Sequence, residues 1–121
     1  MEIRFTADHE WLAIDGDIAK VGITDHAQSL LGELVFVELP AIGREAVRGS
    51  TVATVESVKA ASDVYAPLTG TIIEVNSRAV EDPSLLNSDP LGAGWLFRIR
   101  FSEPSELSHL LSEADYRRLA Q

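Results

Sequence analysis

The chain has 121 residues, enough for one hydrophobic core but too few for two. Hydrophobic residues make up 45% of it and charged residues 24%, which predicts a folded globule and not a disordered chain. The absence of cysteine excludes disulfides, thiolate nucleophiles and zinc-thiolate sites. Nineteen acidic residues against ten basic ones leave a net charge of -9, which disfavours nucleic acid and anionic membranes as partners and favours basic patches on other proteins.

Patterns with a two-residue period dominate the chain. They predict a hairpin over residues 12–23 with its turn at Gly16, and strands over residues 34–39, 51–58, 62–66 and 70–75. Over residues 95–101, Trp95, Phe97, Ile99 and Phe101 alternate with Leu96, Arg98 and Arg100, the pattern of a half-buried strand. Short strands with closely spaced turn signals indicate a sandwich or barrel.

Three short helices are predicted between and after these strands. Thr24 can cap the first, which ends at Gly32 and places Ala27, Leu30 and Leu31 on one face. The second follows Pro104, where leucines at 107, 110 and 111 have helical spacing. The third begins with the capping-box-like segment 112–115 and carries Tyr116 and Leu119. Residues 77–94, rich in Pro, Gly, Asn and Asp, predict a long surface loop.

Lys59 is the only basic residue between Arg48 and Arg78, and it lies between the strands predicted at 51–58 and 62–66. Small residues surround it, so residues 57–62 are expected to form the tip of a hairpin. At such a tip the four-carbon stem of the lysine projects into solvent, where another protein can reach it. Most lysines in this position only solvate the turn, so the pattern by itself does not identify a site.

The segment Glu56-Ser-Val-Lys59-Ala-Ala-Ser-Asp63-Val-Tyr-Ala-Pro67 resembles the lipoyl-attachment segment of the glycine cleavage system H protein family. Further blocks in the same order extend the resemblance over nearly the whole chain: His9-Glu10-Trp11-Leu12, residues 21–28, residues 31–40, residues 70–76, residues 86–90 and Gly94-Trp95. Two departures concern only local loop packing. Ala41 replaces a commonly acidic residue, and Leu91 replaces an aromatic residue that often follows the proline.

The resemblance implies a mainly β fold, a flattened barrel-sandwich hybrid like those of lipoyl and biotinyl carriers, with short peripheral helices that include a C-terminal pair. Residues 1–121 would form a single lipoyl-carrier domain, with lipoic acid attached covalently at Lys59. The implied function is that of a non-catalytic carrier in glycine catabolism and one-carbon metabolism. Its lipoyl arm would accept an aminomethyl group from the pyridoxal-dependent glycine decarboxylase and present it to the aminomethyltransferase. The implied remaining partners are dihydrolipoyl dehydrogenase, which reoxidises the arm, and the lipoylating enzymes.

Roles are also expected for four carboxylates, two from their positions beside Lys59 and the rest from the resemblance. Glu56 and Asp63 flank the lysine and are expected either to orient a basic lipoylating enzyme or only to solvate the turn. In the family the loaded arm folds back into an acidic surface cleft, and the matching positions are Glu10 and Asp63, with Asp8 a weaker candidate. The alternative for Glu10 is a solvated strand residue beside a core tryptophan. The two tryptophans, Trp11 and Trp95, fit either the core or a binding cleft, and the core is favoured.

Catalysis and metal binding by this chain are not expected. His9, His26 and His109 are scattered along the sequence, and no phosphate-binding glycine loop or nucleophile elbow is present. Ser57 and Ser62 lie near Lys59, but a hydrated, protonated lysine at a hairpin tip cannot act as their base. No apolar run approaches the roughly 20 residues of a membrane span. With no basic-then-apolar leader before Glu2, we expect a cytoplasmic bacterial protein, or a mitochondrial matrix protein if the sequence is a mature organelle form.

Other carriers and roles are also considered. A biotin carrier normally places its lysine between methionines, whereas Lys59 lies between Val58 and Ala60. A lipoyl domain of a 2-oxoacid dehydrogenase usually has an acidic residue directly before the lysine, and Val58 argues against this reading. An H-like protein that relays lipoyl groups to 2-oxoacid dehydrogenases would use the same motif, so this alternative stays open. A structural or interaction protein with an unmodified Lys59 is the remaining possibility.

Overall fold

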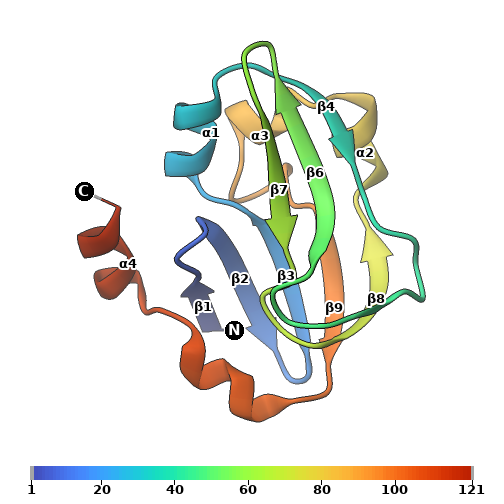
Figure 1. The fold of residues 1–121 in the computed structure, drawn as a ribbon, viewed down its shortest axis with the longest axis vertical. Coiled ribbons are helices and arrows are strands. Elements are labelled where there is room, and N and C mark those ends of the chain that lie inside the picture. The colour runs from blue at the N-terminus through green and yellow to red at the C-terminus, as the bar shows by residue number, and fades with distance from the viewer. Residues whose placement is uncertain (1, 121) are drawn as a thin grey trace.

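The computed structural model describes residues 2–120, which form two antiparallel sheets surrounded by short helices (Figure 1). The larger sheet has six strands in the order β1 (Glu2–Phe5), β2 (Glu10–Asp15), β3 (Ile18–Ile23), β9 (Phe97–Phe101), β8 (Gly70–Val75) and β5 (Glu45–Ala46). The smaller sheet has the order β4 (Leu34–Glu38), β6 (Thr51–Ser57) and β7 (Ala61–Tyr65). The two sheets do not close into one barrel, and the expected flattened barrel-sandwich hybrid is confirmed.

Helices of four to seven residues surround the sheets: α1 (Asp25–Leu31), α2 (Ser77–Glu81), α3 (Leu85–Ser88), the 3-10 helix η1 (Pro104–His109) and α4 (Glu113–Leu119). The two predicted caps are confirmed. Thr24 Oγ1 accepts a hydrogen bond from the backbone N–H of Ala27, and Ser112 Oγ accepts one from that of Asp115. Among the described residues no helix has the length and apolar character needed to cross a bilayer.

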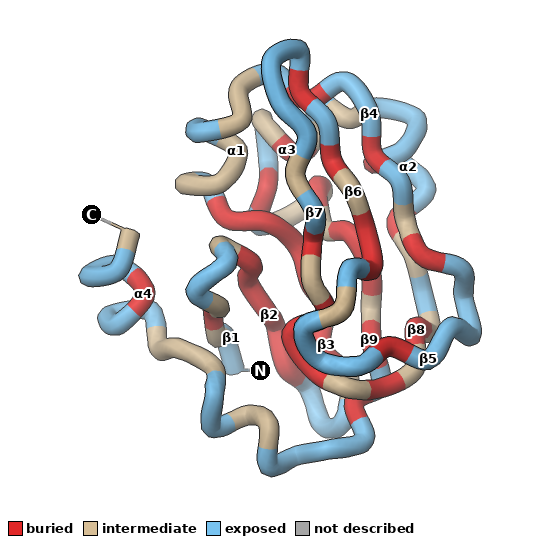
Figure 2. Tube along the Cα trace, in the orientation of Figure 1, coloured by how far each residue is buried: buried red, intermediate tan, exposed pale blue. Residues whose placement is uncertain are grey.

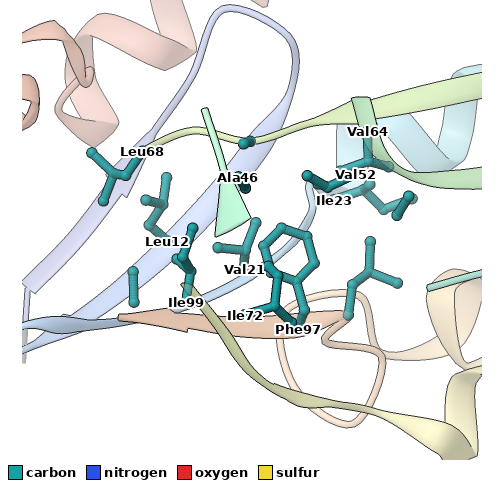
Figure 3. Close-up of a cluster of buried hydrophobic side chains, with 14 of the residues drawn as sticks. Leu12, Val21, Ile23, Ala46, Val52, Val64, Leu68, Ile72, Phe97 and Ile99 are labelled. Carbon is teal, nitrogen blue, oxygen red and sulfur yellow. The ribbon is translucent and has the colours of Figure 1, made fainter. Parts of the chain in front are cut away.

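The main core lies between the two sheets (Figure 3). Inward-facing side chains of the six-stranded sheet, among them Leu12, Val21 and Ile99, pack against the opposite sheet, where Val64 is one of the contributors. The two-residue period produces this arrangement, because alternate residues of a strand point to opposite faces. Each fully buried side chain of this size stabilises the fold by roughly 1.5–3 kcal/mol, and Leu12, Val21 and Ile99 are all fully buried.

A second, smaller core covers part of the opposite face of the six-stranded sheet. Phe5, Trp11, Ala13 and Tyr116 form it. The rings of Phe5 and Tyr116 are stacked with their centroids 4.7 Å apart, and Phe5 pairs with Leu111 just before α4. The C-terminal segment therefore packs on β1 and β2, and β2 is buried on both faces up to Ile14 (Figure 2).

The prediction of a surface loop over residues 77–94 is wrong. The segment contains α2 and α3, and it inserts Ala79 and Leu86 fully into the core. The side chain of Asn76, at the start of this segment, fixes its far end by donating hydrogen bonds to the carbonyls of Ala93 and Trp95, at 2.8 and 2.7 Å. Helices of four and five residues show no measurable periodicity and depend on tertiary contacts, so the sequence pattern could not reveal them.

Smaller differences concern the ends and faces of predicted elements. Leu30 is exposed, although it is predicted to share a face of α1 with Ala27 and Leu31, which are partly buried against the core. Strand β9 begins only at Phe97, and Leu96 is fully buried instead of lying with the arginines. The first helix of the C-terminal pair is of the 3-10 type. The short edge strands β1 and β5 were not predicted, since strands of four and two residues carry little periodic signal.

Candidate functional site

Lys59 lies at the tip of the β6–β7 hairpin, at the top of Figure 1, and its side chain is exposed. The buried Ser57 fixes this tip. Its hydroxyl accepts from the backbone N–H groups of Lys59 (3.3 Å) and Ala60 (3.0 Å), and it donates to the carbonyl of Ala60 (3.2 Å). A backbone bond of 2.7 Å from Ser57 N–H to the Ala60 carbonyl closes the turn. The lysine is thus presented on a rigid turn.

Ser57 has a role that the sequence reading missed. It was considered only as a reactive partner for Lys59, whereas the structure uses its hydroxyl to satisfy the backbone of the tip. Serine hydroxyls commonly form hydrogen bonds to backbone groups two or three residues away in turns, so a serine at the end of a predicted strand is the signal that could have indicated this role. A hydroxyl has one donor and two acceptor positions, and the three contacts of Ser57 use all of them.

The stem of Lys59 passes the end of α1. A Cβ added to Gly32 would lie 3.6 Å from Lys59 Cε, and Val58 N–H donates to the Glu33 carbonyl at 3.3 Å. Asn87 fixes the same corner. It donates to the carbonyl of Gly32 at 2.8 Å, and its side-chain oxygen accepts from Leu34 N–H at 2.9 Å.

These contacts leave an open groove beside the lysine with a volume of about 580 Å³. Polar and small residues of α1, α3 and their flanks line it: Gln28, Ser29, Gly32, Glu33, Ser84, Asn87 and Ser88. The sequence reading did not single out Asn87 as a functional residue, because its partners lie more than 50 residues away along the chain.

Glu56 and Asp63 are both exposed and lie on the outer face of the three-stranded sheet. Glu56 is opposite Ala61 and Asp63 is opposite Thr54, so the two carboxylates are diagonal neighbours on adjacent strands. Glu38 on β4 is also opposite Thr54 and shares this face. No ion pair involves these three carboxylates within residues 2–120.

Glu10 is not the solvated strand residue that one reading of the sequence expected, because it is only 2% exposed. One carboxylate oxygen, Oε2, accepts from the backbone N–H of Tyr65 at 2.8 Å, and the other accepts from Thr6 Oγ1 at 3.0 Å. Burial raises the pKa of Glu10 to about 7, although both hydrogen bonds oppose this shift. A single carboxyl group thereby connects β2 of one sheet with β7 of the other.

Glu10 and Asp8 line one cavity of about 250 Å³, whose other walls are Thr6, Ala7, Arg48, Gly49, Tyr65, Ala66, Pro67 and His109. Asp63 does not line this cavity. On β7 it lies two residues before Tyr65, which does. Lys59 and Tyr65 are six residues apart along the hairpin, which corresponds to roughly 20 Å in a strand. The structure therefore groups Glu10 with Asp8 and places Asp63 between them and the tip.

Two of the three histidines, scattered in sequence, meet in the structure. The rings of His9 and His26 have centroids 4.7 Å apart. His9 Nδ1 lies 2.8 Å from the Tyr116 hydroxyl, which lies 2.6 Å from Thr24 Oγ1. Burial, followed by the proximity of His26, lowers the pKa of His9, while Asp8 acts in the opposite direction. No group of three or more potential metal ligands occurs within residues 2–120.

Trp11 belongs to the smaller core, as expected. It is 3% exposed, and its Nε1 donates to the Pro90 carbonyl at 2.9 Å. Its ring lies against Gly22 of β3, where an added Cβ would come within 2.7 Å of the indole. Glycine at position 22 is therefore what allows the indole to lie flat on the sheet.

Comparisons with known proteins agree with this arrangement. The family model described as "Glycine cleavage H-protein" matches residues 3–121. The "Glycine cleavage system H protein" of Bradyrhizobium diazoefficiens is 55% identical over 113 residues, which cover 93% of each chain. The crystal structure of a glycine cleavage system H protein from Mycobacterium marinum superposes with a TM-score of 0.85 at 40% identity, covering 97% of this chain and 94% of the other.

Proposed function

Since the chain belongs to the glycine cleavage H-protein family and is thereby a non-catalytic lipoyl carrier, we propose that Lys59 is the residue that carries the lipoyl group. The observation that supports this proposal is the exposed amine of Lys59 on a turn that Ser57 holds rigid. The chain has only one other lysine, Lys20, which is half-buried within β3. We further propose that all 121 residues act as one carrier domain, because both sheets contribute to one core.

The residues around Lys59 fit a lipoylated lysine. Ala60 and Ala61 follow it directly and are exposed, so neither obstructs an enzyme that approaches the amine. When attached, the lipoyl group supplies a dithiolane whose sulfur carries the aminomethyl group of glycine from the pyridoxal-dependent decarboxylase to the aminomethyltransferase. Dihydrolipoyl dehydrogenase and the lipoylating enzymes are the other proposed partners. Tethering makes each delivery effectively intramolecular, with a high local concentration set by the reach of the arm.

Asp63 on β7 and the two carboxylates of the cavity, Asp8 and Glu10, are proposed to hold a proton on the amine of the carried group. An amine that keeps its proton has no free lone pair, and a nearby carboxylate favours the protonated form. Asp63 lies on the way from the tip to the cavity of Asp8 and Glu10. Glu10 is buried there, and exclusion from water strengthens its interaction with a cation. On this proposal Asp63 acts first and Glu10 acts at the far end of the cleft.

Intact mass measurement tests the attachment site. Incubation of the unmodified protein with lipoate, ATP and a lipoate ligase should add one lipoyl group to the wild type and none to Lys59→Arg. Lys20→Arg is the matched control and should be modified like the wild type. A lipoylated Lys59→Arg protein, or loss of modification in Lys20→Arg alone, would refute the assignment.

Reconstitution tests the carrier function. The lipoylated protein should support glycine-dependent CO₂ release by the decarboxylase, and the folate-dependent transfer of the carbon by the aminomethyltransferase. A lipoylated protein that is inactive with both enzymes, but donates its lipoyl group to a 2-oxoacid dehydrogenase, would show a relay and overturn the proposed shuttle.

A further inference from the structure

A pair of cations lies on the outer face of the six-stranded sheet, away from the hairpin that carries Lys59. Lys20 on β3 and Arg98 on β9 are directly opposite each other in the strand register, and both are half-buried. Like charges placed opposite each other on neighbouring strands destabilise a sheet. On its other side Arg98 is opposite Glu74 of β8, so Arg98 has an acidic neighbour, whereas no ion pair within residues 2–120 involves Lys20.

Arg98 is held in place by Trp95 and Glu74. Its Cζ lies 5.3 Å from the centroid of the Trp95 ring, a cation–π distance. Its Nε lies 3.0 Å from Glu74 Oε1, but without the alignment of a hydrogen bond. Lys20 takes part in no ion pair within residues 2–120. The pair therefore presents positive charge that an anion could bridge.

The residues next to this pair are apolar. The register Ile3–Ala13–Lys20–Arg98 runs across four adjacent strands on one face, from an apolar end to a cationic end. A cavity of about 320 Å³ opens at the apolar end and is lined by Ile3, Phe5, Trp11, Ala13, Lys20, Leu91 and Glu113. A volume of this order falls at the lower end of the range of small-molecule sites.

A smaller cavity continues at the cationic end. It has a volume of about 140 Å³, it includes Arg98, Asp15 and Ile18, and it shares Ala13 and Lys20 with the larger one. Of the nearby carboxylates in the described part of the chain, only Glu74 forms an ion pair with either cation, and its partner is Arg98. Glu113 is engaged by Arg117 at 2.8 Å, and no ion pair joins Asp15 to Lys20 or Arg98 in the described part of the chain.

We propose that this face binds a small aliphatic monocarboxylate. The chain of the ligand lies in the apolar cavity over Trp11 and Ala13, and its carboxylate lies between Lys20 and Arg98. The apolar cavity excludes a fully hydrophilic anion as the preferred ligand, and the cation pair selects an anionic head group over a neutral one. The site is separate from Lys59, since Lys20 lies within the six-stranded sheet and Lys59 lies in the turn between two strands of the other sheet.

Titration of the ¹⁵N-labelled, unmodified full-length protein with three probes tests the proposal. Octanoate has both chain and charge, 1-octanol lacks the charge, and acetate lacks the chain. Octanoate should bind about tenfold more tightly than 1-octanol, as expected for one hydrogen bond to a charged group. It should also bind more tightly than acetate, because acetate has no chain to bury in the apolar cavity. The amide shifts should centre on Ile3, Ala13 and Lys20. Equal affinity for octanoate and 1-octanol, shifts centred elsewhere, or no binding at millimolar octanoate would overturn the proposal.

Three variants separate the parts of the site. Lys20→Met should weaken octanoate binding about tenfold and leave 1-octanol unaffected, whereas Arg78→Met, which removes an exposed cation on α2, should change neither. Ile3→Ser, at an exposed edge position, should weaken the binding of both octanoate and 1-octanol. Unchanged octanoate binding by Lys20→Met would refute the head-group assignment. Concentration-dependent shifts of the same residues, with dimers in sedimentation velocity, would assign this face to a second copy of the chain instead.

Octanoate binding should also stabilise the protein against thermal unfolding. Octanoate should raise the melting temperature of the wild type by linkage, because it binds only the folded state. Lys20→Met should fold normally, because it removes one member of a like-charged pair, and octanoate should raise its melting temperature much less. An equal increase in both proteins would count against the proposed role of Lys20.

Discussion

Glu10 Oε2 accepts a 2.8 Å hydrogen bond from the backbone N–H of Tyr65, so a buried carboxyl group joins the two sheets across 55 residues of sequence. The same group lines the cavity toward which the carrier arm is proposed to fold. Its protonation state therefore links the stability of the fold to the chemistry proposed for the cleft.

The first prediction concerns Glu10→Gln. Because the pKa of Glu10 is raised from 4.5 to about 7, its contribution to stability is present below pH 4.5 and is lost as the pH rises through 7. Glutamine does not titrate. Relative to the wild type, the variant should gain about 3 kcal/mol in unfolding free energy between pH 4.5 and pH 8. Urea unfolding over this range measures the difference. Thr6→Val removes a hydrogen bond that lowers this pKa. In this variant the loss of unfolding free energy with rising pH should therefore extend to a higher pH than in the wild type. Parallel pH profiles for wild type and Glu10→Gln would contradict the raised pKa.

The second prediction concerns recognition of the hairpin by a lipoate ligase. Glu56 lies on the exposed acidic face close to Lys59, and attraction between exposed charges is screened over about 8 Å at physiological ionic strength. Glu56→Gln should slow lipoylation at low salt more than at high salt. Glu38→Gln, on the same face but on β4, is the matched control and should have the smaller effect. Equal rates for Glu56→Gln and wild type at both salt concentrations would remove Glu56 from recognition.

The third prediction is that the Tyr116 hydroxyl holds the C-terminal helix on the sheet. Tyr116→Phe removes the contacts to His9 and Thr24 and leaves the buried Thr24 hydroxyl without this partner. The expected loss is about 1–2 kcal/mol of unfolding free energy. Tyr65→Phe removes a hydroxyl that makes no hydrogen bond within residues 2–120 and should cost much less. Equal effects of the two variants would show that ring packing, and not the hydroxyl, secures the helix.

The fourth prediction concerns the paired histidines. The pKa of His9 is lowered, so its contribution to stability is present above the unfolded value of 6.5 and is lost as the pH falls below it. His26→Gln removes the nearby positive charge and should raise the pKa of His9. Titration of the imidazole resonances by NMR measures this shift. An unchanged His9 titration in His26→Gln would assign the lowered pKa to burial alone.

The fifth prediction uses two glycines with different surroundings. A Cβ at Gly70 would clash with the Arg100 carbonyl oxygen, which belongs to the backbone of the neighbouring strand. Gly70→Ala should therefore separate β8 from β9 and destabilise the protein by several kcal/mol, in the range of severe overpacking. Gly16, at φ 64 in an open turn, should cost only about 1 kcal/mol when replaced by alanine. Thermal unfolding measures both losses of stability. A small loss for Gly70→Ala together with a large loss for Gly16→Ala would contradict this prediction.

The strands and the hairpin tip could be predicted because their signals are local. The alternation in β9, the Gly16 turn and the small residues around Lys59 each lie within a few positions of one another. The hairpin was correct to within a residue at each end, and the caps Thr24 and Ser112 were found from their short-range patterns.

The contacts that organise the site were not predictable because they are long-range. The carboxyl of Glu10 contacts the backbone of Tyr65, which belongs to the other sheet. Asn87 can bond to Gln28 and Gly32 because α3 packs beside α1. The meeting of His9 with His26 likewise depends on the path of the chain between them. Two residues can be identified as partners from one sequence only when a local pattern connects them, and no such pattern connects these.

The pairing of Phe5 with Leu111 has a practical consequence. It holds β1 and the segment that leads to α4 on one flank of the molecule, away from the β6–β7 tip (Figure 1). An affinity tag fused before Glu2 or after Ala120 would therefore fasten the protein to a sensor chip with Lys59 directed outward. Every immobilised copy would then offer its hairpin to a soluble enzyme in the same way. Random amine coupling would instead consume Lys59 itself.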